Sequence, residues 1–156
     1  MEIVDIYGNK KEVNCIGCAI TRGDIVAPGG IIMENDSFSA QQDYELPIPG
    51  FIIVGSKRHI RGVADFTEKE KSDYINILTK IRKAMKEALD IETIFSIQIE
   101  YTEHHFNHWL LPVIPEMQEK FGYGIKSVKP TLLLYAKDNM KTSENIQKLK
   151  DYFASK

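Results

Sequence analysis

Residues 105–112 read His105-Phe106-Asn107-His108-Trp109-Leu110-Leu111-Pro112, and this stretch decides how the rest of the chain is interpreted. We expect residues 104–111 to form a β-strand, in which successive side chains point to opposite faces of a sheet. The two faces carry His105, Asn107 and Trp109 on one side, and His104, Phe106 and His108 on the other. His108 therefore points away from a ligand placed over Asn107, and His104 and His108 are expected to be packed or surface imidazoles.

The two cysteines of the chain form a Cys-x-x-Cys pair, Cys15-Ile16-Gly17-Cys18. A structural zinc ion takes four thiolate or imidazole ligands in a tetrahedron, and one such pair supplies two of them. The other two ligands must then be distant, and His59 and His105 can supply them if the strands beside them pair. The spacing also leaves open a thioredoxin-like redox pair and two unconnected reduced cysteines. The redox pair is disfavoured because no strand–Cys-x-x-Cys–helix pattern is expected here.

The composition is that of an ordinary globular protein. The 156 residues are 43% hydrophobic and 27% charged, which is enough for one domain with a core. The net charge of −2 provides no global basic field that would attract nucleic acid. No segment has transmembrane length, and no signal pattern is present, so we expect no membrane partner and a cytoplasmic location. In that reducing compartment the two cysteines favour metal or redox chemistry over a structural disulfide.

The order of the expected elements predicts an α+β fold with a mostly antiparallel sheet of about five strands. The clearest element is a helix over residues 67–89, because Thr67 and Glu70 form a capping box and apolar residues recur every three or four positions. The remaining expected elements are a leading strand or arm at residues 1–7, strands at residues 31–33, 37–43, 51–54, 93–100 and 104–111, and C-terminal helices at residues 115–121, 130–137 and 143–153.

Four segments, taken in order, resemble the histidine triad family, whose signature is His-φ-His-φ-His-φ-φ with φ apolar. These are residues 38–43 (Phe-Ser-Ala-Gln-Gln-Asp), 47–50 (Pro-Ile-Pro-Gly), 57–60 (Lys-Arg-His-Ile) and 105–112. The resemblance covers residues 15–112 and implies one domain over residues 1–156, with a core at residues 13–113. Residues 114–156 look like the helical C-terminal extension of one bacterial branch, in which Trp replaces the third histidine.

The resemblance implies a Zn²⁺ cofactor. The zinc-containing branches, which include the uridylyltransferases of galactose metabolism, bind the metal with a Cys-x-x-Cys pair, a histidine in the Lys-x-His position and the first histidine of the triad. Those positions are occupied here by Cys15, Cys18, His59 and His105.

The resemblance also implies a nucleotide site. Phe38 is expected near the base, Asp43 at the ribose hydroxyls, Gln98 and Thr102 at the phosphate, and Trp109 at the third position of the triad. Without the resemblance, the same residues would be a core phenylalanine, a turn cap and exposed strand polars. The implied partners are a purine nucleotide or a dinucleoside polyphosphate, and a second copy in a homodimer.

Asn107 stands where the family has its nucleophilic histidine, which attacks the α-phosphate of a nucleotide. An asparagine amide cannot be that nucleophile, because its nitrogen lone pair is delocalised. Three interpretations stay open: a nucleotide-binding protein that has lost catalysis, an active hydrolase or transferase with different chemistry, and an engineered substitution. A more remote possibility is a zinc-stabilised interaction protein that binds no nucleotide.

Overall fold

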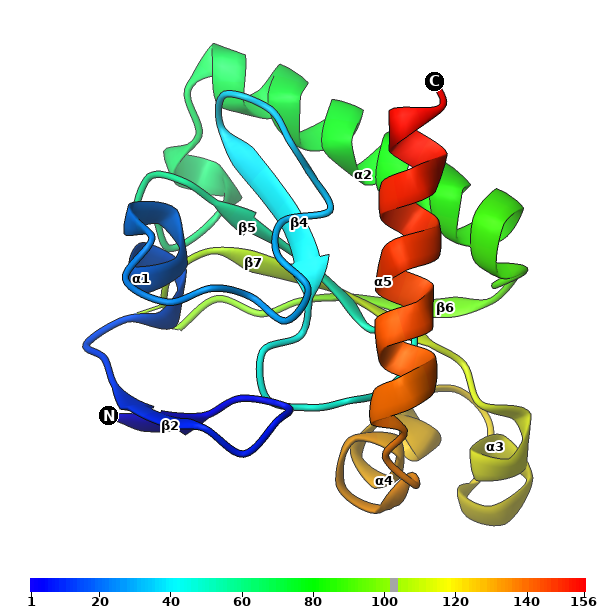
Figure 1. The fold of residues 1–156 in the computed structure, drawn as a ribbon. Coiled ribbons are helices and arrows are strands. Elements are labelled where there is room, and N and C mark those ends of the chain that lie inside the picture. Colours follow the sequence, from blue (N-terminus) through cyan, green and yellow to red (C-terminus); the bar gives the residue numbers. More distant parts are fainter. Residues whose placement is uncertain (102–103) are drawn as a thin grey trace.

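The centre of the fold is a five-stranded antiparallel sheet with the strand order β3-β4-β5-β7-β6 (Figure 1). The computed structural model describes residues 1–101 and 104–156, so the predicted phosphate contact Thr102 lies outside the described residues. The strands are β3 (Met33–Glu34), β4 (Phe38–Gln42), β5 (Ile52–Ser56), β6 (Ile94–Gln98) and β7 (Asn107–Pro112). The α+β class and the five-stranded sheet were predicted from the sequence and are confirmed.

The helix α2 (Glu68–Leu89) covers one face of this sheet (Figure 1). Its capping box forms as predicted: Glu70 N donates to Thr67 Oγ1 at 3.1 Å, and Thr67 N donates to Glu70 Oε2 at 3.0 Å. Glu70 also binds the guanidinium of Arg58. The start of α2 is thereby tied to the segment that follows β5.

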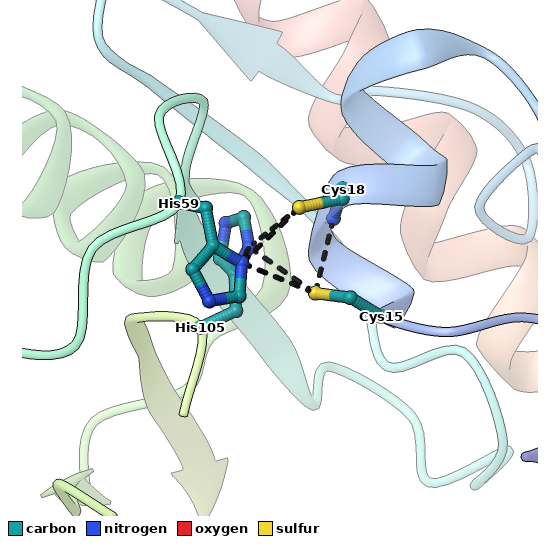
Figure 2. A group of neighbouring side chains, drawn as sticks. All are labelled: Cys15, Cys18, His59 and His105. Carbon is teal, nitrogen blue, oxygen red and sulfur yellow. Dashed lines mark hydrogen bonds between the residues drawn. The ribbon is translucent and has the colours of Figure 1, made fainter. Parts of the chain in front are cut away.

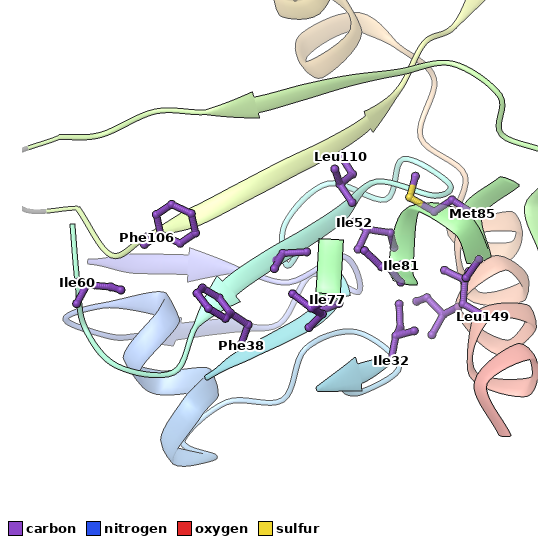
Figure 3. Close-up of a cluster of buried hydrophobic side chains, with 14 residues drawn as sticks. Ile32, Phe38, Ile52, Ile60, Ile77, Ile81, Met85, Phe106, Leu110 and Leu149 are labelled. Carbon is purple, nitrogen blue, oxygen red and sulfur yellow. The ribbon is translucent and has the colours of Figure 1, made fainter. Parts of the chain in front are cut away.

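The main core lies between the sheet and α2 (Figure 3). Ile77, Ile81 and Met85 of α2 have no exposed surface, and they pack with apolar residues of β4, β5 and β7. The C-terminal helix α5 (Asn139–Ala154) packs against α2 and adds Ile146 and Leu149 to the same core. Two shorter helices, α3 (Pro115–Phe121) and α4 (Val128–Leu134), precede α5, so the predicted helical C-terminal region is confirmed. Single 3-10 turns complete the chain at Val63–Asp65 and Gly124–Ser127.

The N-terminal segment differs from the prediction. Strands β1 (Glu2–Val4) and β2 (Lys10–Glu12) form a separate hairpin, and a helix α1 (Ile16–Arg22) follows directly. The Cys-x-x-Cys pair therefore lies at the start of a helix, with Cys18 in its first turn, and our reason for disfavouring a redox pair was wrong. The helix is only two turns long and ends at Gly23 in the left-handed conformation, so it gives little periodic signal in the sequence.

The pairing register assigns each side chain to a face of the sheet. Gly55 of β5 pairs with Asn107, Val54 pairs with His108, and Ile53 pairs with Trp109. Because paired residues point to the same side, Asn107 and Trp109 face away from α2 and His108 faces toward it. None of the helices in the described ranges is long and apolar enough to cross a bilayer.

The capping box gives a direct test of the start of α2. We expect Thr67→Ala to lower the free energy of unfolding by about 1 kcal/mol, because Glu70 N loses its acceptor. Chemical denaturation measures this, with an unchanged m value. The matched control is Thr79→Ala, whose hydroxyl only donates to carbonyls within α2 and whose loss should stay within about 0.5 kcal/mol. Equal losses of unfolding free energy in the two variants would show that the capping hydroxyl stabilises the protein no more than a hydroxyl within the helix.

Candidate metal and ligand site

Two loops at one end of the sheet bring the predicted metal ligands together. His59 follows β5 and His105 precedes β7, and the antiparallel pairing of these strands places both histidines at the same end. Backbone hydrogen bonds extend the pairing into this region, since Ser56 N donates to Phe106 O at 3.2 Å and Phe106 N donates to Ile60 O at 2.6 Å. The condition set from the sequence, that the two strands pair, is met.

The two cysteines lie at the start of α1 and face the histidines (Figure 2). Cys15 is the residue before the first turn, and its Sγ accepts a hydrogen bond from Cys18 N at 3.5 Å. The two sulfurs and the Nδ1 atoms of His59 and His105 all lie within 4.8 Å of one another. The structure therefore assembles all four predicted ligands in one cluster, and both cysteines are free thiols.

The spacing within this cluster matches a tetrahedral zinc site. Usual zinc bond lengths give sulfur–nitrogen edges of about 3.6 Å and a nitrogen–nitrogen edge of about 3.3 Å. Cys15 Sγ lies 3.6 Å from His59 Nδ1 and 3.4 Å from His105 Nδ1, and Cys18 Sγ lies 3.2 and 3.4 Å from the same atoms. The two Nδ1 atoms are 3.1 Å apart. The donor set and its dimensions both fit Zn²⁺.

The protonation of His105 also suits a metal ligand. Its Nε2 lies 2.7 Å from the carbonyl oxygen of Ser56, to which it can only donate, so a neutral ring keeps the lone pair of Nδ1 directed into the cluster. Burial lowers the pKa of His105, which favours that neutral ring. Burial raises the pKa of the Cys18 thiol, and a bound cation would oppose this shift.

Gly17 is required for this geometry, and the sequence reasoning gave it no role. A Cβ atom at position 17 would lie 2.5 Å from Cδ2 of His105, which is closer than nonbonded carbons can approach. The His105 ring cannot easily move aside, because its Nε2 is hydrogen-bonded to the Ser56 carbonyl oxygen. The glycine between the two cysteines therefore leaves the space in which His105 lies against α1.

A pocket of about 360 Å³ opens beside the cluster, on the face of the sheet opposite α2. Its floor comes from β4, β5 and β7, and one wall comes from Ile16 and Ile20 of α1. Three of the predicted nucleotide-site residues line it, namely Asp43, Asn107 and Trp109. Cys15 and His105 line it too, so the pocket and the metal cluster share a wall.

Asp43 has an unusual environment in this pocket. Its Oδ2 accepts hydrogen bonds from Glu45 N at 3.1 Å and Leu46 N at 2.8 Å, so it caps a turn as the simpler interpretation held. Burial outweighs these bonds and raises the pKa of Asp43 to about 6. The carboxyl group lines the pocket, and its pKa lies well above the usual range of an aspartate.

The structure does not bring Phe38 or Gln98 to the pocket. Phe38 is completely buried among Phe66, Tyr74 and Phe106 on the α2 face, so it is not available to a base in the pocket. Gln98 pairs with His108 and shares that face. Both assignments need correction, because they relied on position in the motif and ignored strand parity.

The two histidines beside Asn107 differ from each other. His108 lies on the α2 face, where its Nδ1 contacts the hydroxyl of Tyr74 and its Nε2 lies 2.6 Å from Ser96 Oγ. It thus points away from Asn107, as predicted. His104, which was expected to be an ordinary imidazole, lines the pocket, and its buried Nε2 has no hydrogen-bond partner among the described residues. Strand alternation did not reveal this, because β7 begins only at Asn107.

Comparison with known proteins shows which fold the chain has. No protein-family model matches the chain. The "Protein hit" of Bacillus subtilis strain 168 is 28% identical over 114 residues, which are 71% of this chain and 77% of that protein. A crystal structure of a Zn-bound histidine triad family protein from Mycobacterium smegmatis matches with a TM-score of 0.65 and 20% identity, covering 91% of this chain and 94% of that one. A hypothetical histidine triad nucleotide-binding protein from Sulfolobus tokodaii matches with a TM-score of 0.64 and 13% identity, covering 90% and 93%.

These matches show that the chain has the histidine triad fold. The fold implied by the sequence resemblance is therefore confirmed. The replacement of the third histidine by Trp109, as in one bacterial branch, stays a prediction.

The role of Gly17 can be tested by metal content. We expect Gly17→Ala to weaken metal binding at least tenfold, because the new methyl group displaces His105 from the cluster. Competition with a chelator, followed by elemental analysis, measures this. Gly55→Ala is the matched control, since a Cβ there meets nothing closer than 3.8 Å. Unchanged metal affinity in Gly17→Ala would show that His105 is not a ligand.

Proposed function

We propose that this protein is a zinc-stabilised nucleotide-binding protein of the histidine triad type. One observation carries the proposal: Asp43 and Asn107 line a single pocket whose wall includes two members of the four-residue metal cluster. These are the positions at which the resemblance expects the ribose hydroxyls and the reacting phosphate. The Sulfolobus protein with the same fold is named as nucleotide-binding, which supports the assignment.

Zinc is proposed as a structural ion, held by Cys15, Cys18, His59 and His105. Four protein ligands close a tetrahedral site, whereas catalytic zinc keeps one position for water or substrate. The ion would tie α1 to the loops that precede β7 and follow β5. The Zn-bound histidine triad protein from Mycobacterium smegmatis supports zinc as the metal.

The ligand is proposed to be a purine nucleotide or a dinucleoside polyphosphate. Asp43, with both turn hydrogen bonds on Oδ2, would accept hydrogen bonds from ribose hydroxyls. Asn107 would donate its amide hydrogens to a phosphate oxygen, and the Trp109 ring would pack against the ligand. A pocket of about 360 Å³ lies within the usual range for small-molecule sites.

We propose that the protein binds nucleotides without turning them over. Asn107 cannot attack phosphorus, and His108 lies on the other face of the sheet. One observation favours a second candidate, a nucleotide hydrolase or transferase: the imidazole of His104 lines the same pocket with an unpartnered Nε2. A cytoplasmic location, consistent with the two free thiols, and a homodimer are proposed from the resemblance.

A histidine introduced at position 107 tests whether the pocket is a nucleotide site that lacks only its nucleophile. We expect the parent protein to bind AMP in calorimetry but to leave adenosine phosphoramidate and diadenosine tetraphosphate intact. Asn107→His should turn over at least one of these substrates, with product about 100-fold above the background that the parent shows, because a neutral imidazole can attack the α-phosphorus. Turnover is measured by chromatography of the products.

Two further variants separate the alternatives. If the parent is already active and His104→Ala abolishes the activity, the second candidate is correct and non-catalytic binding is excluded. His108→Ala serves as the control, because its side chain faces α2 and cannot reach the pocket. If zinc-containing protein gives flat titrations with AMP and GMP, the nucleotide assignment fails and a zinc-stabilised interaction protein is favoured.

The raised pKa of Asp43 predicts pH-dependent binding. A carboxyl group accepts two hydroxyl hydrogen bonds only when ionised, so affinity is full well above pH 6 and is lost as the pH falls through that value. We expect adenosine to bind about tenfold more weakly at pH 5 than at pH 7.5. Adenosine is the probe because it has no phosphate that titrates in this range.

Asp43→Asn is the control for that profile. It should bind adenosine weakly at both pH values, with a flat profile between them. Zinc content is measured at each pH, because acid also releases metal from thiolates. A wild-type profile that is flat while zinc is retained would exclude Asp43 as a ligand group.

A further inference from the structure

Gln41 is a buried amide that the pocket leaves unsatisfied. Its side chain is only 5% exposed and lines the pocket floor. Its Oε1 is completely buried and has no hydrogen-bond partner in the part of the chain that the structure describes. A buried carbonyl-type oxygen without a donor is costly, and proteins retain such groups where a ligand or water completes them. The amide lies beside Gly55, which has no side chain to cover it.

The strand register shows where a ligand would meet this amide. Gln41 pairs with Ile53, and Ile53 pairs with Trp109, so these three side chains form one row across the pocket floor. With neighbouring strands about 4.8 Å apart, the outer two members of the row stand about 10 Å from each other. A flat ring placed over Ile53 would have the amide at one edge and the indole at the other.

The neighbouring rows indicate where the base of a nucleotide would lie. Asp43 stands one row away from Gln41 on the same face, and the Gly55–Asn107 pair stands one row away on the other side. A nucleotide held at Asp43 by its ribose hydroxyls would carry its base within reach of the adjacent row, which contains Gln41, Ile53 and Trp109. Ile16 and Ile20 of α1 supply an apolar wall for the base.

The charge of the pocket also favours a neutral group beside Gln41. The lining residues that the structure describes include Asp43 and Glu45 but no lysine or arginine side chain. A phosphate beside Gln41 would meet the field of these carboxylates, and the ammonium of Met1, which also lines the pocket, is already paired with Glu12. A nucleobase carries no charge and satisfies the amide through hydrogen bonds alone.

We propose that the Gln41 carboxamide reads the edge of an adenine base and sets the base preference of the nucleotide site proposed above. Adenine offers an amino hydrogen for Oε1 and, beside it, a ring nitrogen that accepts from Nε2, which is the bidentate pairing that glutamine makes with adenine. Guanine fits less well, because the same edge of guanine carries two adjacent acceptors, O6 and N7, so Oε1 would face an acceptor instead of a donor. The inference rests on the proposed function and adds the ligand's base to it.

The test compares AMP with purine riboside 5′-monophosphate, which lacks only the 6-amino group. Calorimetry on the zinc-containing protein should show AMP binding at least tenfold more tightly, since the analogue leaves Oε1 unpaired. Gln41→Met, which keeps the length of the side chain, should bring the two dissociation constants within twofold of each other. The same variant should melt no lower than the parent without ligand, because it removes an unsatisfied polar atom.

Gln98→Met is the matched control. Gln98 is also an amide with a buried unpartnered atom, but its register with His108 places it on the α2 face. Its substitution should leave the tenfold preference intact. Equal binding of the two ligands by the parent, a preference that survives Gln41→Met, or tighter binding of GMP than AMP would overturn the inference while nucleotide binding stands. Failure of the parent to bind AMP, GMP and the analogue would overturn the proposed function together with the inference.

Discussion

The antiparallel pairing of β5 with β7 is the constraint on which the rest of the site depends. It brings the segments after Ser56 and before Asn107 to the same end of the sheet, so that His59 and His105 meet the two cysteines. The same register turns Asn107 and Trp109 toward the pocket and His108 toward α2. A shift of one residue would exchange these faces, because the side-chain period of a strand is two. The metal cluster and the ligand pocket thus both depend on the pairing of β5 with β7.

The sequence predicted what depends on short-range signals and on ligand chemistry. The capping box and apolar stripe of α2 located that helix to within one residue at its start, and the two histidines combined with the Cys-x-x-Cys pair identified a cluster that spans 90 residues of sequence. The direction of His108 also followed, because strand alternation is a purely local rule. These features need no knowledge of how the elements pack.

The remaining features of the site depend on how distant segments pack against one another, which cannot be read from the sequence. Helix α1 is too short for a periodic signal, and the importance of Gly17 appears only when His105 from a distant segment lies against it. Phe38 and Gln98 were misplaced because the motif gives their order along the chain but not their face of the sheet. Gln41 and His104 were missed because an unsatisfied buried atom is visible only once its neighbours are in place.

The N-terminal segment has an apolar cluster of its own, and the metal site lies between this segment and the central sheet. The first 25 residues contribute nothing to the main core beneath α2; their apolar side chains, such as Ile3, Ala19 and Ile25, pack in a small cluster around Tyr44. Cys15 and Cys18 face His59 and His105, so a bound metal would join this segment to the loops at the ends of β5 and β7. Segments with few buried contacts open independently of the global fold. Loss of a bound metal would therefore loosen the α1 wall of the pocket while the main core beneath α2 stays folded.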